Sequence, residues 1–237
     1  MASMKSRRVF GNLLWWSTHQ KRIIDALGEG VVKYITDFTS FPIDDTTGDP
    51  TPEYTVTVVE AGTGVTTIAQ TDASGGQVLI TTAAAEDDGG SYQLNGESFK
   101  TSGNELYFGT KIATNEATQS DFFIGLAVTD TALSGGVANG IYFESVDGGT
   151  GISAVTESGS TETQTDDLAT LVDDTFVELE FYYNGSNVVF FINGASVATH
   201  TANIPSTEMR VSFEFLTGSA VAKTMTLDWI RCIQIGR

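Results

Sequence analysis

The chain has 237 residues, and its 30 acidic and 12 basic residues give a formal net charge of −18. A chain of this length buries enough surface for a core of its own, whereas so acidic a body repels phosphate and excludes nucleic acid as a partner. No apolar run approaches the roughly 20 residues of a membrane span, so no membrane is expected as a partner either. The single cysteine, Cys232, excludes an intrachain disulfide and a thiolate zinc cluster.

Residues 1–36 differ from the rest of the chain. Residues 1–33 contain six basic and two acidic residues, and the remainder contains six basic and 28 acidic ones. Apolar residues recur at steps of three and four, which is the spacing of one helix face: Val9, Phe10, Leu13, Leu14, Ile23, Ile24, Leu27 and Val31. The sequence therefore predicts a basic, amphipathic and partly helical N-terminal arm over residues 1–36, whose helix ends near Gly28 and Gly30.

The arm has two interpretations that its residues leave open. It lies across its own body, or it docks on a partner with a tryptophan as the anchor; binding to a membrane surface is a weaker third interpretation. Trp15 and Trp16 are adjacent, so they point in different directions and one of them cannot join the apolar face. The residues predicted to bind a partner are Arg7, Arg8, Phe10, Leu13, Leu14, Trp15, Trp16, Lys21 and Arg22.

A linker or a long loop is predicted over residues 37–53, where "FPIDDTTGDPTPE" contains three of the four prolines. From residue 54 to 237, short strands alternate with glycine-rich turns, which is typical of a sandwich or a barrel. The predicted strands lie near 54–60, 64–70, 76–82, 105–114, 121–129, 140–145, 151–156, 175–183, 187–192, 195–201, 208–216 and 224–234. The segment "DFFIGLAVTD" is apolar on both faces, as expected for a central strand that is covered on both sides.

Two stretches resemble a known family. "VELEFYYNGSNVVFFINGASVA" has Asn-Gly turns before and after its second strand, and "MTLDWIRCIQIG" forms the final strand. Both resemble concanavalin-A-like lectin/glucanase (LamG-like) jelly rolls. "GGQVLITTAAAEDDGGSYQLNGESFK" and "NELYFGTKIATNEATQSDFFIGLAVTD" resemble the domains of this fold in tailed-phage virion proteins. The resemblance covers residues 70–237 and implies an all-β, antiparallel, two-sheet jelly-roll sandwich.

The glucanases of this fold supply their catalytic acids from one strand, in an E-x-D-x-x-E or E-x-D-x-E pattern. Here Glu178 and Glu180 share a strand face, but Tyr182 takes the next position on that face. We therefore predict no catalytic residues and a protein that is not an enzyme. No cofactor and no metal site are predicted either, although Ca²⁺ favours acidic turns such as those that contain Asp87, Asp88, Asp130 and Asp147.

The resemblance implies a non-enzymatic virion structural protein, a decoration (cement) protein on the capsid exterior of a tailed phage. Its expected partners are the major capsid protein or other virion proteins, which it would bind through the arm and the sandwich. The chain is also expected to form a homo-oligomer, with a trimer favoured. The alternative is a carbohydrate-binding (lectin-like) module of a phage head or tail fibre. In that case Tyr142, Tyr182 and Tyr183 would offer a stacking surface to a glycan.

Overall fold

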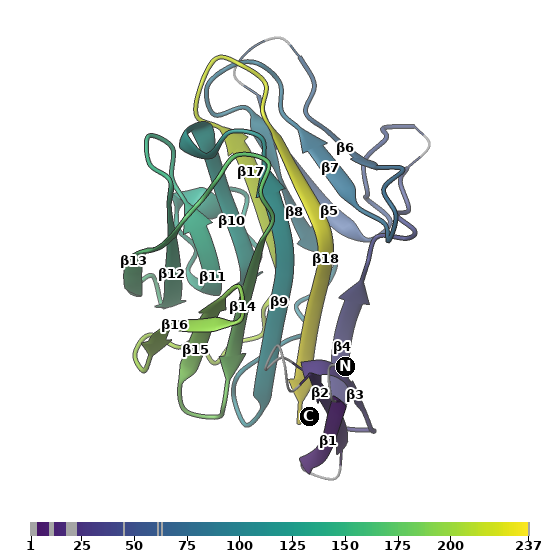
Figure 1. Ribbon diagram of the computed structural model, residues 1–237, viewed down its shortest axis with the longest axis vertical. Coiled ribbons are helices and arrows are strands. Elements are labelled where there is room, and N and C mark those ends of the chain that lie inside the picture. The colour runs from purple at the N-terminus through teal and green to yellow at the C-terminus, as the bar shows by residue number, and fades with distance from the viewer. Residues whose placement is uncertain are drawn as a thin grey trace.

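A computed structural model of the protein describes residues 4–9, 12–17, 23–44, 46–60, 62 and 64–236. The described ranges contain three antiparallel sheets (Figure 1). We name the first the N-terminal sheet; its order is β1 (Met4–Val9), β2 (Asn12–Ser17) and β3 (Ile23–Leu27). None of the helices in these ranges has the length and hydropathy of a membrane span.

The other two sheets face each other. Sheet I has the order β13 (Glu162–Thr170), β12 (Gly151–Ser158), β11 (Asn139–Ser145), β10 (Ser120–Ala127), β17 (Arg210–Thr217), β8 (Gly89–Leu94) and β5 (Tyr54–Val59). Sheet II has the order β16 (Ala195–His200), β15 (Val188–Ile192), β14 (Val177–Tyr183), β9 (Glu105–Thr114), β18 (Thr224–Ile235), β7 (Val78–Thr81) and β6 (Thr67–Gln70). The strand β4 (Val31–Thr36) pairs with the second half of β18. Two short 3₁₀ helices, η1 (Ala117–Gln119) and η2 (Leu133–Gly135), lie in connections.

The core lies between sheets I and II because their strands alternate apolar side chains inward. On β14, Val177, Leu179 and Phe181 belong to the core cluster. The Phe181 ring stacks on Phe108 of β9, with ring centroids 5.1 Å apart. The structure confirms the predicted all-β jelly-roll sandwich.

The prediction of a helical arm is wrong, because residues 4–9, 12–17 and 23–27 form strands. A β-bulge between Trp15 and Trp16 shifts the register of β2 against β3. Such a bulge inserts an extra residue and changes which residues share a face. Ile23 and Ala26 are therefore both buried on the same side, whereas Leu27, which was counted on the predicted helix face, is 51% exposed.

The N-terminal sheet packs against the outer face of sheet II. Its buried side chains Leu14 and Ile23 cluster with Tyr107 of β9 and with Ile233 and Ile235 of β18. In Figure 1 this sheet lies at the lower end of the molecule, beside the end of β18. The segment from 37 to 53, predicted as a linker, places Phe38 and Phe41 in the core cluster.

The outer face of sheet I is partly covered by residues 128–138, which contain η2. Leu133 and Val137 of this loop pack on Phe123, Tyr142 and Val155. The Phe123 and Tyr142 rings stack with centroids 4.2 Å apart. The loop leaves the neighbouring part of the face open, and that opening positions the candidate site.

Candidate functional site

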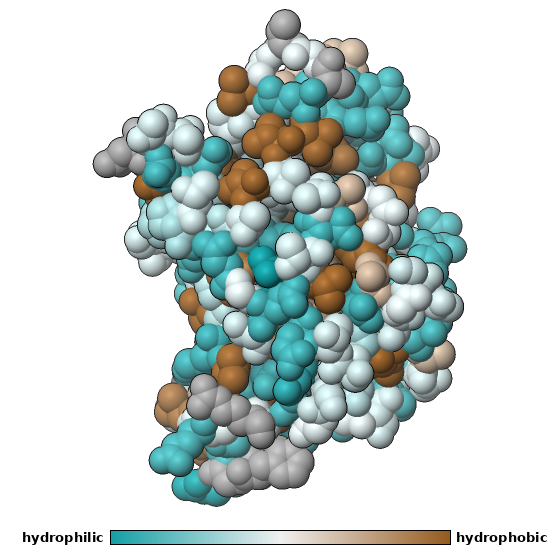
Figure 2. Space-filling view, turned by 180° about the vertical axis from the view of Figure 1, so that it is seen from behind, coloured by the Kyte–Doolittle hydropathy of each residue, from teal (hydrophilic) through white to brown (hydrophobic). Residues whose placement is uncertain are grey.

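A pocket of about 380 Å³ lies beside the loop 128–138. Carboxyl groups of Asp87, Asp121, Glu144 and Glu214 contribute to its lining. Figure 2 shows the molecule from behind, where hydrophilic residues gather across the middle of the face. A volume of this size is typical of small-molecule sites.

Three neighbouring strands of sheet I each supply one carboxyl group to this pocket. The residue Phe123 of β10 pairs with Glu144 of β11 on one side and with Glu214 of β17 on the other. Asp121 lies two residues before Phe123 and therefore shares its face. The acids thus converge through strand pairing, although they are far apart in the sequence.

The carboxylate of Glu214 is held by the loop that covers it. Its side chain is 1% exposed, and it accepts hydrogen bonds from the backbone N–H of Leu133 at 3.3 Å and of Ser134 at 2.8 Å. The hydroxyl of Ser91 on β8 donates a further hydrogen bond to it. These donors fix the orientation of the carboxylate and join the loop to the sheet.

Two carboxyl groups of the pocket hold their protons unusually tightly. Burial, and then the charges of Glu162, Asp166 and Glu157, raise the pKa of Glu144 to about 7. Burial, and then the charge of Asp147, raise the pKa of Asp121 to about 6. Glu144 is therefore present in both its acidic and its basic form at neutral pH, as proton transfer requires.

A buried hydroxyl beneath the pocket has no partner. Ser145 pairs with Phe122, whose ring belongs to the core between the sheets, so the Ser145 side chain points to that side and away from Glu144. It is 3% exposed, and its Oγ makes no hydrogen bond within the described part of the chain. Buried polar atoms are normally satisfied, so this hydroxyl costs stability.

The glutamates of the sequence motif, Glu178 and Glu180, lie on the outer face of sheet II, away from this pocket. Glu180 is 2% exposed and accepts a hydrogen bond of 2.6 Å from the hydroxyl of Tyr107. It is thus a buried carboxyl rather than a solvated one. The described residues contain no group of three or more His, Cys, Asp and Glu side chains that could hold a metal ion.

The structure does not bring together the three tyrosines considered for stacking. Tyr142 is 2% exposed on sheet I, and its hydroxyl donates to Glu157 at 3.1 Å. Tyr182 packs with the cluster under the N-terminal sheet, and Tyr183 packs against the main core. None of the three therefore forms an open aromatic platform with another.

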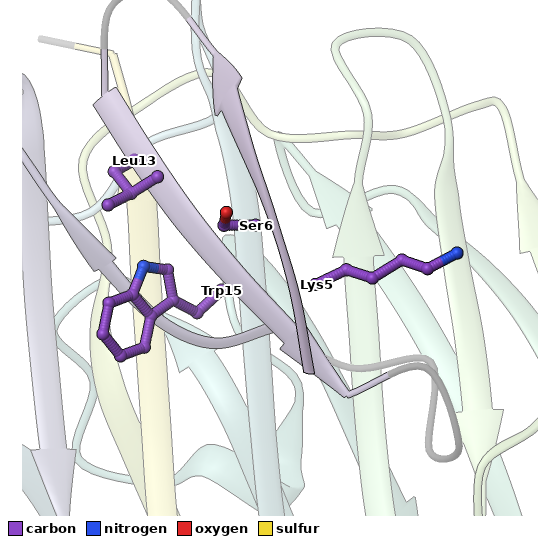
Figure 3. Close-up of a pocket in the computed structure, with 4 residues that line it drawn as sticks. All are labelled: Lys5, Ser6, Leu13 and Trp15. Carbon is purple, nitrogen blue, oxygen red and sulfur yellow. The ribbon is translucent and has the colours of Figure 1, made fainter. Parts of the chain in front are cut away.

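The arm residues divide between two faces of the N-terminal sheet. Leu14 and Trp16 face sheet II, and the guanidinium of Arg7 lies 4.6 Å from the Trp16 ring and pairs with Glu105 at 3.1 Å. Leu13 and Trp15 project to the other side of β2, as Figure 3 shows. The exposed side chain of Arg8 belongs to β1, whereas Phe10, Lys21 and Arg22 lie outside the described residues.

A second pocket, of about 260 Å³, is lined by Lys5, Ser6, Leu13 and Trp15. The Trp15 side chain is 38% exposed and Leu27 of β3 is 51% exposed. The side chain of Lys5 extends away from Leu13 and Trp15 (Figure 3). Among the described residues of the N-terminal sheet, Trp15 and Leu27 thus expose apolar surface beside this pocket.

Comparisons with known proteins place these features in context. The family model described as "SO2946-like, C-terminal domain" matches residues 63–232. No curated protein matches the chain.

Three solved structures share the fold. One is a Bacteroides ovatus GH16 protein of a mixed linkage glucan PUL, in complex with a G4G4G3G product. Its sequence is 12% identical to this chain, and the two structures superpose with a TM-score of 0.59. The superposition covers 83% of this chain and 98% of that one. The endo-beta-1,4-glucuronan lyase of the fungus Trichoderma reesei is 12% identical with a TM-score of 0.51, covering 74% and 89%. The carbohydrate recognition domain of Emp46p is 8% identical with a TM-score of 0.54, covering 84% and 97%.

These likenesses confirm the concanavalin-A-like jelly roll and correct one prediction. The absence of an acid motif on a single strand led to the expectation of a protein that is not an enzyme. That expectation is contradicted, because the structures that share this fold include a lyase and a GH16 protein. The relationship to tailed-phage virion proteins gains no support from these comparisons and stays a prediction.

Proposed function

The chain belongs to the family of SO2946-like C-terminal domains, and from that premise we propose that it binds a saccharide chain in the acidic pocket of sheet I. The observation that carries the proposal is the convergence of Asp121, Glu144 and Glu214 on one pocket. Solved structures that share the fold are described as carbohydrate-active or carbohydrate-recognising. This supports the lectin-like alternative over a purely structural role.

The chemistry of the lining suits a saccharide. Carboxylates accept hydrogen bonds from hydroxyl groups, and serine hydroxyls donate and accept them; Ser134 lines the pocket beside the carboxyl groups. Val146 and Leu216 add apolar surface against which the C–H faces of a sugar ring can pack. Charged partners make such hydrogen bonds about twice as strong as neutral ones.

Binding is tested by titrating neutral and charged oligosaccharides into the protein and measuring heat or chemical-shift changes. We expect the Asp121→Asn and Glu144→Gln variants each to lose about 1–3 kcal/mol of affinity, which is typical of a lost hydrogen bond to a charged group. Glu178→Gln, on the far side of the sandwich, is the matched control and should bind as the wild type does. Equal binding by all four proteins would contradict the proposed site.

Cleavage of the bound chain is a second candidate function, favoured by the pKa of about 7 of the Glu144 carboxyl. Glu144 donates its proton to the glycosidic oxygen, while water adds its hydroxyl to the anomeric carbon and gives its proton to the Asp121 carboxylate. Asp121 and Glu144 occupy diagonal positions on neighbouring strands, so their side chains lie within reach of one substrate. Inverting enzymes separate their two carboxyl groups by roughly 6.5–9.5 Å, which leaves room for the attacking water.

Cleavage is tested by measuring the reducing ends released from soluble glucans and glycans. Glu144→Gln cannot donate a proton and should lose at least about 10²-fold in kcat, the low end of general-acid contributions, while still binding the saccharide. The wild-type rate should fall as the pH rises above about 7, because Glu144 then loses its proton. A rate that is unchanged in this variant would exclude Glu144 as the acid.

Attachment to a virion shell, on the capsid exterior and as a homo-oligomer, is retained as a proposal for the outer face of the N-terminal sheet. What supports it is the exposure of Trp15 and Leu27 beside the pocket lined by Leu13. Trp15→Ser removes the largest apolar side chain of this face. It should abolish co-sedimentation with capsid shells, whereas Glu178→Gln should leave it intact.

A further inference from the structure

We infer that the outer face of the N-terminal sheet docks on the opposite end of the sandwich in a second copy of this chain. We name that end the valine end; it is formed by the connections 115–119, 146–150, 171–176 and 218–223 between strands of the two facing sheets. The inference rests on the homo-oligomer proposed above and names the two surfaces that join its copies.

The connections of the valine end are held together, because three of them bond to the fourth, 115–119. The backbone N–H groups of Gly148 and Gly218 donate to carbonyl oxygens of this connection at 2.9 and 3.0 Å. In return, the N–H of Ala117 donates to the carboxylate of Asp173 at 2.8 Å. The valine end is therefore one continuous surface rather than a set of separate loops.

Each of the three outer connections exposes a valine side chain. Val146 is 63% exposed, Val172 is 57% exposed and Val221 is 59% exposed. An apolar residue that is exposed singly needs no explanation, whereas apolar residues gathered on one surface are typical of a site that a partner covers. The three valines surround the same central connection, so one partner surface can cover them together.

The valine end is also acidic. Its connections contain four acids, Glu116, Asp147, Asp173 and Asp174, and a single base, Lys223. Lys223 pairs with Glu116, and the three aspartates form no ion pair within the described part of the chain. Three negative charges thus stay uncompensated beside the valines.

The outer face of the N-terminal sheet has the complementary character. Trp15 is 38% exposed and Leu27 is 51% exposed. The first 33 residues contain six basic and two acidic residues, a net charge of +4. Strand pairing places these side chains in two rows on this face: Arg8, Leu13 and Leu27, and next to them Ser6, Trp15 and Asp25.

The two surfaces lie at opposite ends of the molecule, so one chain cannot join them to each other. The strand β18 begins beside the valine end, and its last residues, Ile233 and Ile235, pack under the N-terminal sheet. Its 12 residues span about 40 Å at about 3.3 Å each. In Figure 1 the yellow connection that leads into β18 lies at the upper end, and the N-terminal sheet lies at the lower end.

A second copy supplies what each surface lacks. Trp15 and Leu27 meet the exposed valines, and the opposite net charges favour this orientation over a contact between two equal ends. A contact between two different surfaces joins copies head to tail. An open row of such copies leaves one sheet face free at its end, where a virion shell can bind.

The test measures self-association of the full chain by sedimentation velocity. We expect the wild type to associate between about 1 and 500 µM, as small interfaces do. Trp15→Ser disables the sheet face, and Val172→Lys/Val221→Lys disables the valine end by adding positive charge to it; each should weaken association at least about tenfold, as loss of an interface anchor does. The control is Ile43→Lys, which adds the same charge at a 47% exposed residue outside both surfaces and should associate as the wild type does.

Mixing the two variants gives the sharper result. Trp15→Ser keeps its valine end and Val172→Lys/Val221→Lys keeps its sheet face, so the mixture should form a species of two chains that neither variant forms alone. Thermal melts verify that each variant is folded.

Two outcomes would overturn the inference while the homo-oligomer stands: association of either variant as tight as that of the wild type, or a mixture that stays monomeric. A wild type that is monomeric over the whole range would overturn both. Binding to shells and to saccharides is measured separately, so those proposals stand or fall on their own results.

Discussion

Glu144 holds its proton to a higher pH than an ordinary glutamate because it is buried among other acids. Its neighbour Asp121 is affected in the same way to a smaller extent. Such groups favour the folded state when they are protonated and oppose it when they are ionised. The candidate site is therefore a place where the fold gives up stability at neutral pH, as functional sites commonly do.

A pH-dependent loss of stability follows from Glu144. Its folded-state pKa of about 7 lies above the unfolded value near 4.5, so its stabilisation is complete below about pH 4 and is lost as the pH rises through about 7. The Glu144→Gln variant lacks this loss. In urea unfolding, the free energy of unfolding of the variant minus that of the wild type should increase by about 1–3 kcal/mol between pH 5 and pH 8. A difference that does not depend on pH would contradict the assignment.

The buried hydroxyl of Ser145 opposes folding. Because it has no partner in the described structure, Ser145→Ala removes no internal hydrogen bond and relieves the cost of burying a polar group. The free energy of unfolding should therefore rise by about 1–3 kcal/mol. Urea denaturation measures the change, and a loss of stability would contradict this reading of Ser145.

Among the strands, the two faces of β2 have opposite roles. Leu14 is fully buried against sheet II, whereas Trp15 is 38% exposed. We expect Leu14→Ala to detach the N-terminal sheet at a cost of about 2–5 kcal/mol. Trp15→Ala should cost about 1 kcal/mol or less, because an exposed side chain loses little on truncation. Hydrogen exchange of the amides of residues 4–17 reports both changes, and equal protection in the two variants would contradict this division.

The strands that the sequence predicts best are those with clear alternation and tight turns. The hairpin of β14, β15 and β16 follows from alternating apolar residues and two Asn-Gly turns, and the structure confirms it. The strand β8 was missed because Gly89 and Gly90 suggest a turn. Here Gly89 is required by close packing, since a Cβ at that position would lie 2.0 Å from the carbonyl oxygen of Phe215.

Two other elements show why local patterns were insufficient. The strand β13 was missed because "ETQTDDLAT" lacks apolar alternation, which an edge strand does not need. The site was missed because its acids lie on three strands, whereas the glucanase motif places its acids on one. Asp121, Glu144 and Glu214 come together only through the pairing of β10 with β11 and β17, and the second pairing joins strands that are far apart in the sequence.

For the whole molecule, the net charge of −18 opposes the folded state. Self-repulsion of this kind destabilises a compact chain, and salt screens it over a Debye length of about 10 Å at 0.1 M. The midpoint of thermal unfolding at neutral pH should therefore rise by several degrees, which corresponds to about 1 kcal/mol, as NaCl increases from about 0.05 to 0.5 M. A midpoint that falls with salt would show that ion pairs outweigh the repulsion.

The pairing of β4 with β18 also determines how the molecule responds to force. Val31 pairs with Ile235 and Thr36 with Ile230, so the chain enters β4 at the same end of the molecule at which β18 finishes (Figure 1). Tension applied between the two ends of the chain loads this pair of strands in the unzipping geometry. The hydrogen bonds between β4 and β18 then break one residue pair at a time. The N-terminal strands peel away under low tension and lengthen the molecule, while the two facing sheets stay packed on each other around the core.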